Sequence, residues 1–114
     1  MIVLYGRDDD PPLSMVKAAL AEQKTPFLFV DQCALHEYGI LFEVSDRGLT
    51  GHIQCPGADV PLCGISAIYA RLLDAPAGRD HLATLHARAF HETLVEWLDL
   101  SPALVINKIG RAHV

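Results

Sequence analysis

Residues 1–30, MIVLYGRDDDPPLSMVKAALAEQKTPFLFV, decide the fold class, because they hold two short apolar runs on either side of a helix signal. The first run, residues 2–5, ends at Gly6 and is typical of a buried strand. The second run, residues 27–30, follows Pro26 and predicts another strand. Strand, helix and strand in this order normally give a parallel pair joined by a right-handed crossover. The chain therefore opens as an α/β fold.

The helix between these two runs is expected to begin at Asp10, whose side chain can cap it. Prolines occupy positions 11 and 12, and the first turn of a helix tolerates proline because amide hydrogens there have no intrahelical partner. The spacing of apolar residues predicts a helix that ends near Gln23 and has one apolar face. That face holds Leu13, Val16 and Leu20.

In the middle of the chain the spacing of apolar residues changes from helical to alternating. Apolar and polar residues alternate over 40–44 and again over 49–55, with a turn at 45–48, which predicts an antiparallel hairpin with one solvent-exposed face. Residues 60–62 are consistent with a short edge strand. The apolar run 65–69 fits either a strand or a helix, and we expect a strand.

The last third predicts a long helix and a final strand. Asp80 can cap a helix running to about Leu100, and residues 103–106 form an apolar run short enough for a buried strand. The helix carries an apolar stripe at helical spacing, which is typical of a core face: Ala83, Ala87, Phe90, Leu94 and Trp97. The predicted fold class is α/β, a small Rossmann-like sheet with crossover helices and an antiparallel hairpin.

Length, composition and net charge limit the kinds of partner that we expect for this chain. The 114 residues suffice for one domain, and a hydrophobic content of 51% is that of a folded globular chain. Nine Lys and Arg against 14 Asp and Glu give a net charge of -5, which disfavours nucleic acid as a partner. No apolar run approaches the roughly 18 to 20 residues that span a bilayer, and no basic region precedes the first strand. We expect a cytoplasmic protein without a membrane partner.

Candidate binding residues follow the predicted strands, because open α/β sheets bind ligands at the carboxyl ends of their strands. Gly6 opens a loop that contains Asp8, Asp9 and Asp10, although acidic residues beside a helix start usually serve as caps. Arg71 follows the 65–69 run, and its guanidinium could fork onto a carboxylate or phosphate. The alternative for this arginine is a surface ion pair with a residue such as Asp74.

Other familiar sites are disfavoured. The loop after Gly6 has neither glycine-rich phosphate-binding pattern, so we expect no nucleotide there. His81, His86 and His91 recur every five residues, and each step rotates a helical side chain by roughly 140 degrees, so they cannot meet on one metal. The three cysteines are too irregularly spaced for paired zinc ligands, and buried or incidental thiols are the plainer interpretation.

The order of these segments resembles a known family. The strand and Asp/Pro-rich loop at 1–12, FLFVDQ at 27–32, the hairpin, AIYAR at 67–71 and LDLSPALVIN at 98–107 together look like the amino-terminal pre-ATP-grasp domain of RimK/glutathione-synthetase-like ATP-grasp proteins. The likeness covers residues 1–107 and implies the substrate-side lobe of a carboxylate–amine ligase, whose substrate is a small-molecule carboxylate or a peptide. Gly6 and Arg71 would be its substrate-binding residues. ATP and Mg²⁺ would be bound by lobes that this chain lacks, so the fragment should hold no cofactor and be inactive alone.

The sequence departs from that family after Asn107. Residues 109–114, IGRAHV, are what a common sequencing adapter (ATC GGA AGA GCA CAC GTC) encodes, and the preceding adapter bases permit Lys108. We expect residues 108–114 to be a non-native tail, with the native gene continuing past Asn107. Apolar residues at 104–106 and on the second helix would then have packed on the missing lobes, which predicts self-association of the fragment.

A second interpretation is a glutathione-transferase-like or thioredoxin-like binding module, and a plain structural interaction domain is a third. The transferase interpretation requires a cis Pro61, a carboxylate-binding Ser66 and a helix beginning near residue 65. The conformation of residues 65–72 separates the two, because a strand there supports the ligase lobe and a helix supports the transferase.

Overall fold

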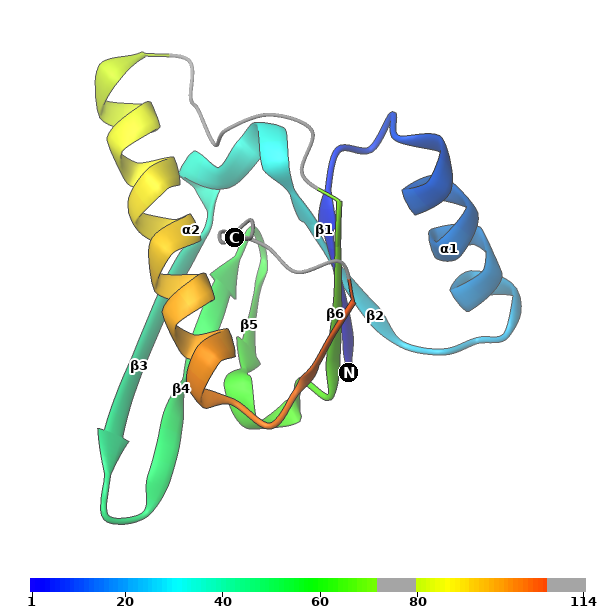
Figure 1. The fold of residues 1–114 in the computed structure, drawn as a ribbon. Helices are drawn as coiled ribbons and strands as arrows, with labels where there is room; N and C mark the ends of the chain where they lie inside the picture. Colours follow the sequence, from blue (N-terminus) through cyan, green and yellow to red (C-terminus); the bar gives the residue numbers. More distant parts are fainter. Residues whose placement is uncertain (72–79, 107–114) are drawn as a thin grey trace.

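The structure is a computed structural model that describes residues 1–71 and 80–106. These residues form two sheets, two α-helices and two short 3-10 helices (Figure 1). In chain order the elements are β1 (Ile2–Gly6), α1 (Pro11–Glu22), β2 (Phe27–Asp31), η1 (Gln32–Glu37), β3 (Gly39–Ser45), β4 (Gly48–Cys55), β5 (Ala58–Pro61), η2 (Leu62–Gly64), β6 (Ala67–Arg71), α2 (His81–Leu100) and β7 (Leu104–Ile106).

The larger sheet is parallel and has the strand order β2-β1-β6-β7. From the central pair β1 and β6, the chain crosses outward to β2 through α1 and to β7 through α2. Right-handed crossovers that run in opposite directions place their helices on opposite faces of a sheet. Accordingly, α1 and α2 lie on the two sides of this sheet (Figure 1). The predicted α/β class is confirmed.

The predicted hairpin forms a separate antiparallel sheet of order β3-β4-β5 rather than joining the parallel one. It lies on the same side of the parallel sheet as α2 (Figure 1). The edge piece expected at 60–62 is β5, which begins earlier, and the run expected at 65–69 is strand β6, shifted by two residues. The strand interpretation of that run is therefore confirmed for the residues described there.

The main core fills the space between the parallel sheet, α2, η1 and the second sheet. Val3, Tyr5, Val30 and Ile68 enter it from the sheet. The predicted stripe of α2 is largely confirmed, although Ala83 is only half-buried and two further residues of the helix are buried. The buried residues of α2 are Ala87, Phe90, Leu94, Val95, Trp97 and Leu98. No described helix is long and apolar enough to cross a membrane.

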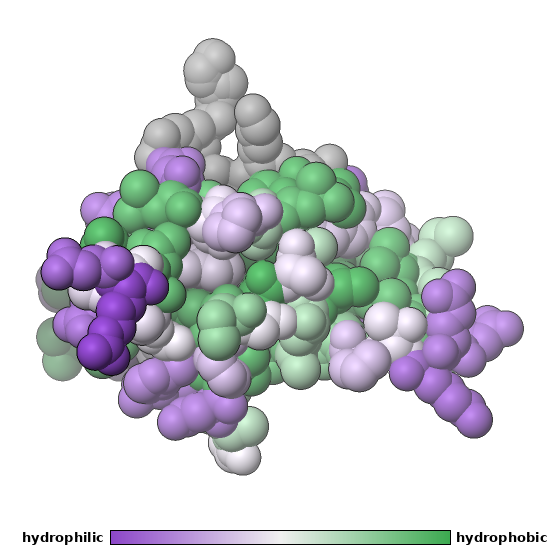
Figure 2. Space-filling model, turned by 90° about the horizontal axis from the view of Figure 1, so that it is seen from below, coloured by the Kyte–Doolittle hydropathy of each residue, from purple (hydrophilic) through white to green (hydrophobic). Residues whose placement is uncertain are grey.

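The surface is divided between apolar and charged regions. Seen from below, apolar residues cover much of the middle of the molecule, and strongly hydrophilic residues gather at its two ends (Figure 2). On the opposite side of the parallel sheet from the main core, α1 makes a smaller apolar layer. Within α1, Leu13 is fully buried, while Val16 and Leu20 are half-buried. The molecule thus has one large core and one thin one.

Candidate functional site

The two central strands, β1 and β6, form a switch point of the parallel sheet. The chain leaves β1 toward α1 on one face and approaches β7 from β6 by way of α2 on the other face. Open α/β sheets bind ligands at such a point, in the crevice outside the carboxyl ends of the strands. Gly6 and Arg71 are the last residues of β1 and β6, and they are register partners. The topology therefore brings the two predicted binding residues together.

Gly6 has a packing role at this position. A Cβ atom placed on it would lie 2.8 Å from the carbonyl oxygen of Arg71 and 2.9 Å from a methyl carbon of Leu13. Such separations are well inside van der Waals contact, so a side chain here would push α1 or β6 outward. The missing side chain is thus explained by the close approach of α1 to the sheet. A ligand contact at Gly6 stays a prediction.

Arg71 forms an ion pair with Asp10 across the carboxyl end of the sheet. Its Nε donates to Asp10 Oδ2 at 2.7 Å, and its Nη2 donates to Asp10 Oδ1 at 3.4 Å. The carboxylate is almost fully buried, with 4% of its side chain exposed, whereas 32% of the Arg71 side chain is exposed. The guanidinium therefore satisfies a buried carboxylate on one side and faces solvent on the other.

This ion pair corrects an expectation about Asp10. The residue stands at the N-cap position of α1, as predicted, but its side chain makes no capping hydrogen bond. The carboxylate turns to Arg71 instead, because two hydrogen bonds from a cationic guanidinium are stronger than one bond from a neutral backbone amide. The hydrogen bond from Arg71 and the charge of Asp10 both raise the pKa of the Arg71 guanidinium. The suggested partner Asp74 lies outside the described residues.

The loop after β1 is held by further ion pairs. Arg7 forks onto Asp9, with Nε to Oδ1 at 3.0 Å and Nη2 to Oδ2 at 2.8 Å. Lys17, on α1, donates to Asp8 Oδ1 at 3.2 Å. The three aspartates of this run, predicted as caps or ligands, are therefore each paired with a cation: Asp8 with Lys17, Asp9 with Arg7 and Asp10 with Arg71.

An open depression of about 310 Å³ lies where β1 and β2 end. It is lined by Arg7, Asp8, Asp9, Asp31 and Cys33. Asp31 and Cys33 were not singled out from the sequence, although Asp31 directly follows an apolar run and the rule of strand ends applies to it equally. The Asp31 side chain accepts from the Cys33 amide at 2.9 Å, which begins η1. Arg71 does not line this depression, so the described edge has two separate features.

The charge pairing at this edge bears on phosphate and metal binding. At Arg7 and Lys17 a phosphate would compete with the paired carboxylates of Asp9 and Asp8, and the loop has no glycine cradle of backbone amides. Within residues 1–71 and 80–106, no group of three or more His, Cys, Asp or Glu is placed to hold a metal ion.

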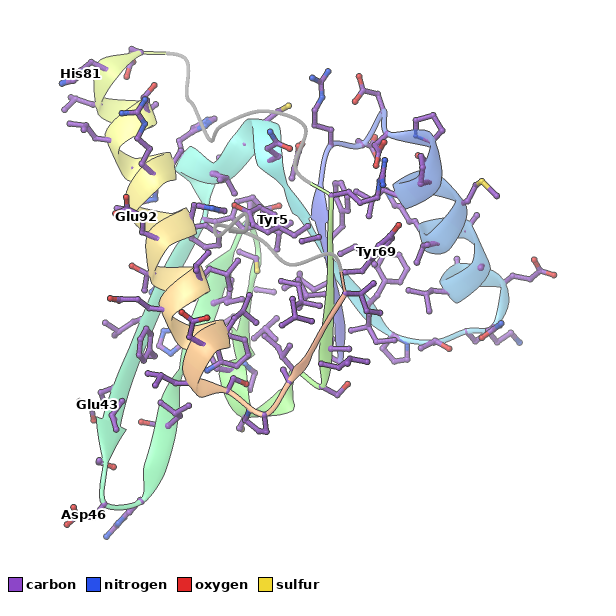
Figure 3. All side chains as sticks on the ribbon, in the orientation of Figure 1. Tyr5, Glu43, Asp46, Tyr69, His81 and Glu92 are labelled. Carbon is purple, nitrogen blue, oxygen red and sulfur yellow. The ribbon has the colours of Figure 1, made fainter. Side chains whose placement is uncertain are left out.

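The three histidines of α2 have different surroundings. The ring of His91 meets the Tyr5 hydroxyl, with Nδ1 at 2.9 Å from the oxygen, and His86 Nε2 bonds the Tyr38 carbonyl oxygen. His81 is exposed at the start of α2 (Figure 3). Burial lowers the pKa of His91, with Glu92 opposing that shift, and burial raises the pKa of Tyr5. A neutral imidazole that accepts from a protonated phenol satisfies both groups inside the core.

Comparison with known proteins gives a structural match. No family model matches the sequence, and no curated protein matches it. Among solved structures, the chain is similar in fold to the macrocyclase MdnC from Microcystis aeruginosa MRC, whose crystal structure holds its precursor peptide MdnA. The TM-score is 0.64 at 18% sequence identity, and the match covers 96% of this chain. The chain corresponds to 38% of the length of that macrocyclase.

Proposed function

We propose that this chain is the amino-terminal, substrate-side lobe of an ATP-dependent carboxylate–amine ligase of the ATP-grasp type. The structural likeness to a macrocyclase supports a link to the ATP-grasp enzymes, and the order of the sequence motifs supports the same link independently. A substrate that is a peptide fits the precursor peptide bound by the macrocyclase. The domain would span residues 1–107, and the lobe alone would not turn over.

The observation that carries this proposal is the position of Arg71 at the switch point of the sheet. Its guanidinium is anchored by the buried carboxylate of Asp10, yet a third of the side chain stays exposed. An anchored guanidinium has already lost part of its side-chain freedom, so binding a substrate carboxylate costs less entropy. In the proposed enzyme, Arg71 holds a carboxylate of the substrate, and the loop after Gly6 borders the same crevice.

ATP and Mg²⁺ belong to the remainder of the proposed enzyme, because the described residues offer neither a phosphate cradle nor a group of metal ligands. ATP would supply a phosphoryl group that activates the substrate carboxylate for attack by an amine. This lobe would contribute substrate binding and orientation. Orientation of reactants is a large part of catalysis, so a lobe without reacting groups can still control turnover.

The transferase-like interpretation has less support. Residues 67–71 are a strand, and no cis peptide bond occurs among the described residues, so Pro61 lacks the geometry that interpretation required. The Ser66 hydroxyl donates to the Met1 carbonyl oxygen at 3.4 Å, at the amino end of β6. That end is opposite to the crevice. Ser66 is therefore engaged with the backbone and is far along the strand from the ligand edge.

The experiment begins with recovery of the genomic sequence downstream of the Asn107 codon. The complete protein is then incubated with ATP, Mg²⁺ and candidate carboxylates, and hydroxylamine is added to trap an acyl phosphate as a hydroxamate. We expect ADP and hydroxamate to appear in equal amounts, and only with the complete chain. ADP release with no carboxylate dependence would contradict the ligase proposal.

Arg71→Lys in the complete protein tests whether Arg71 binds the carboxylate of the substrate. The variant keeps the charge but loses the planar fork, so we expect the KM for the carboxylate substrate to rise about tenfold, with the KM for ATP unchanged. Lys17→Arg is the matched control, because Lys17 lies in an exposed ion pair on α1. Equal effects on both substrates would place Arg71 in a structural role only.

A further inference from the structure

Among residues 1–71 and 80–106, the face of the parallel sheet that carries α1 is covered over only part of its width. α1 lies over β1 and β2, because Leu13 packs beside Gly6 and the Lys17 ammonium lies 4.7 Å from the centre of the Phe29 ring. Parallel strands lie about 4.8 Å apart, so four strands present room for two helices of about 10 Å diameter. One helix position on this face, above β6 and β7, has no occupant among the described residues (Figure 1).

One row of side chains shows how burial changes across the face of the sheet that carries α1. Phe29, Leu4, Tyr69 and Ile106 are consecutive register partners on β2, β1, β6 and β7, so they lie side by side on this face. Leu4 is fully buried beside α1, Tyr69 is half-buried, and Ile106 is 45% exposed. Tyr69 points toward the side that carries α1, whereas Tyr5 points toward α2 (Figure 3). Burial in this row is therefore greatest at Leu4 on β1 and least at Ile106 on β7.

The neighbouring row and the opposite face complete the comparison. Leu104, in register with Ala67, is 61% exposed on the same face. On the opposite face, Ile68 is buried and Val105 packs against the main core. In the part of the chain that the structure describes, β7 is thus an edge strand with one face packed and one face apolar and uncovered. Parallel sheets are normally covered on both faces, and an apolar surface left open usually contacts a partner.

We propose that a helix from the remainder of the same full-length polypeptide packs on this face of β6 and β7, against Ala67, Tyr69, Leu104 and Ile106. This inference rests on the proposed function, because it requires a longer native chain. The choice of occupant follows from two observations. β7 is the last described element and ends beside the bare face, and the chain covers only 38% of the macrocyclase whose fold it shares. The helix needs a stripe of apolar residues to match the four that it covers.

The test compares the same substitutions in the 114-residue chain and in the complete protein. Leu104→Glu and Ile106→Thr remove apolar surface from the bare face, and Met15→Glu is the control, because Met15 is 72% exposed on α1. In the 114-residue chain we expect all three to change the Tm by less than about 2 °C. In the complete protein we expect Leu104→Glu and Ile106→Thr to lower the Tm by about 5 °C or more, with Met15→Glu unchanged.

Two outcomes would overturn the inference. If the complete protein tolerates Leu104→Glu as well as Met15→Glu, nothing in the chain covers this face. If the complete protein sediments as a dimer that Leu104→Glu converts to a monomer, the occupant is a second copy. Carboxylate-dependent ADP release from the same preparations separates this inference from the proposed function. If the complete protein is an active ligase but its Tm is unchanged by Leu104→Glu, only the proposed helix is contradicted. If it is inactive but its Tm falls with Leu104→Glu, only the ligase proposal is contradicted.

Discussion

Gly6 and Arg71 are register partners at the carboxyl ends of β1 and β6, and the space that a Gly6 side chain would need is filled by the Arg71 carbonyl oxygen at 2.8 Å. The two residues predicted to bind substrate are therefore coupled through packing. A side chain at position 6 would press on the backbone of the strand that carries the exposed guanidinium. The close approach of α1 and β6 at this edge therefore depends on a glycine at position 6.

Gly6→Ala should destabilise the chain. The added methyl group meets backbone on one side and Leu13 on the other, so the expected loss in the free energy of unfolding is about 1 to 3 kcal/mol. Urea unfolding followed by circular dichroism measures it. Gly64→Ala is the control, because a Cβ there meets nothing within 4 Å. Equal stability of the two variants would mean that α1 moves away from β1 at little cost.

Asp10→Asn should weaken the link between α1 and β6. An amide oxygen still accepts from the Arg71 guanidinium but carries no negative charge, so the expected loss in the free energy of unfolding is about 1 kcal/mol. Asp8→Asn affects an exposed pair with Lys17 and should cost less than about 0.5 kcal/mol. Urea unfolding at low and moderate salt checks both. If Asp8→Asn lowers the free energy of unfolding as much as Asp10→Asn does, burial of the Asp10 carboxylate does not strengthen its ion pair.

Asp80→Ala should shorten the first turn of α2. The Asp80 carboxylate accepts from the Ala83 amide at 2.8 Å, and loss of such a cap typically costs about 1 kcal/mol. Glu96→Ala, at an exposed position later in the same helix, should leave the free energy of unfolding nearly unchanged. Thermal unfolding of both variants gives the comparison. An unchanged Tm for Asp80→Ala would show that the main core alone fixes the start of α2.

The Tyr5–His91 pair should make stability depend on pH. Burial lowers the pKa of His91 in the folded chain, so the unfolded chain binds a proton at higher pH than the folded chain does. The contribution is fully present above the unfolded pKa of about 6.5 and is lost as the pH falls through the folded pKa. Urea unfolding at pH 7.5 and 5.5 should show lower stability at pH 5.5.

His91→Gln tests the source of this pH dependence. Glutamine keeps an acceptor for the Tyr5 hydroxyl but does not titrate, so the difference in stability between pH 7.5 and 5.5 should shrink. His81→Gln, at an exposed histidine of the same helix, should retain the wild-type difference. If both variants keep the full difference, the dependence comes from other titrating groups.

The sequence by itself determined the local elements of this protein. Apolar runs, the paired prolines of α1 and the alternation of the hairpin are local signals, since each reports the conformation of neighbouring residues. They were sufficient for the α/β class and for the strand at Ala67–Arg71. They also placed Gly6 and Arg71 at the carboxyl ends of two strands, which is the edge of the sheet where we expect a ligand.

Only the tertiary structure decided which residues meet across long separations in the chain. Asp10 and Arg71 are 61 residues apart and Tyr5 and His91 are 86 apart, and periodicity carries no information about such pairs. A capping role for Asp10 was the best local interpretation, because the competing guanidinium comes from a distant strand. The split into two sheets follows from the free energy of packing whole elements together, which no single segment contains. The same holds for the face of β7 that the described residues leave uncovered.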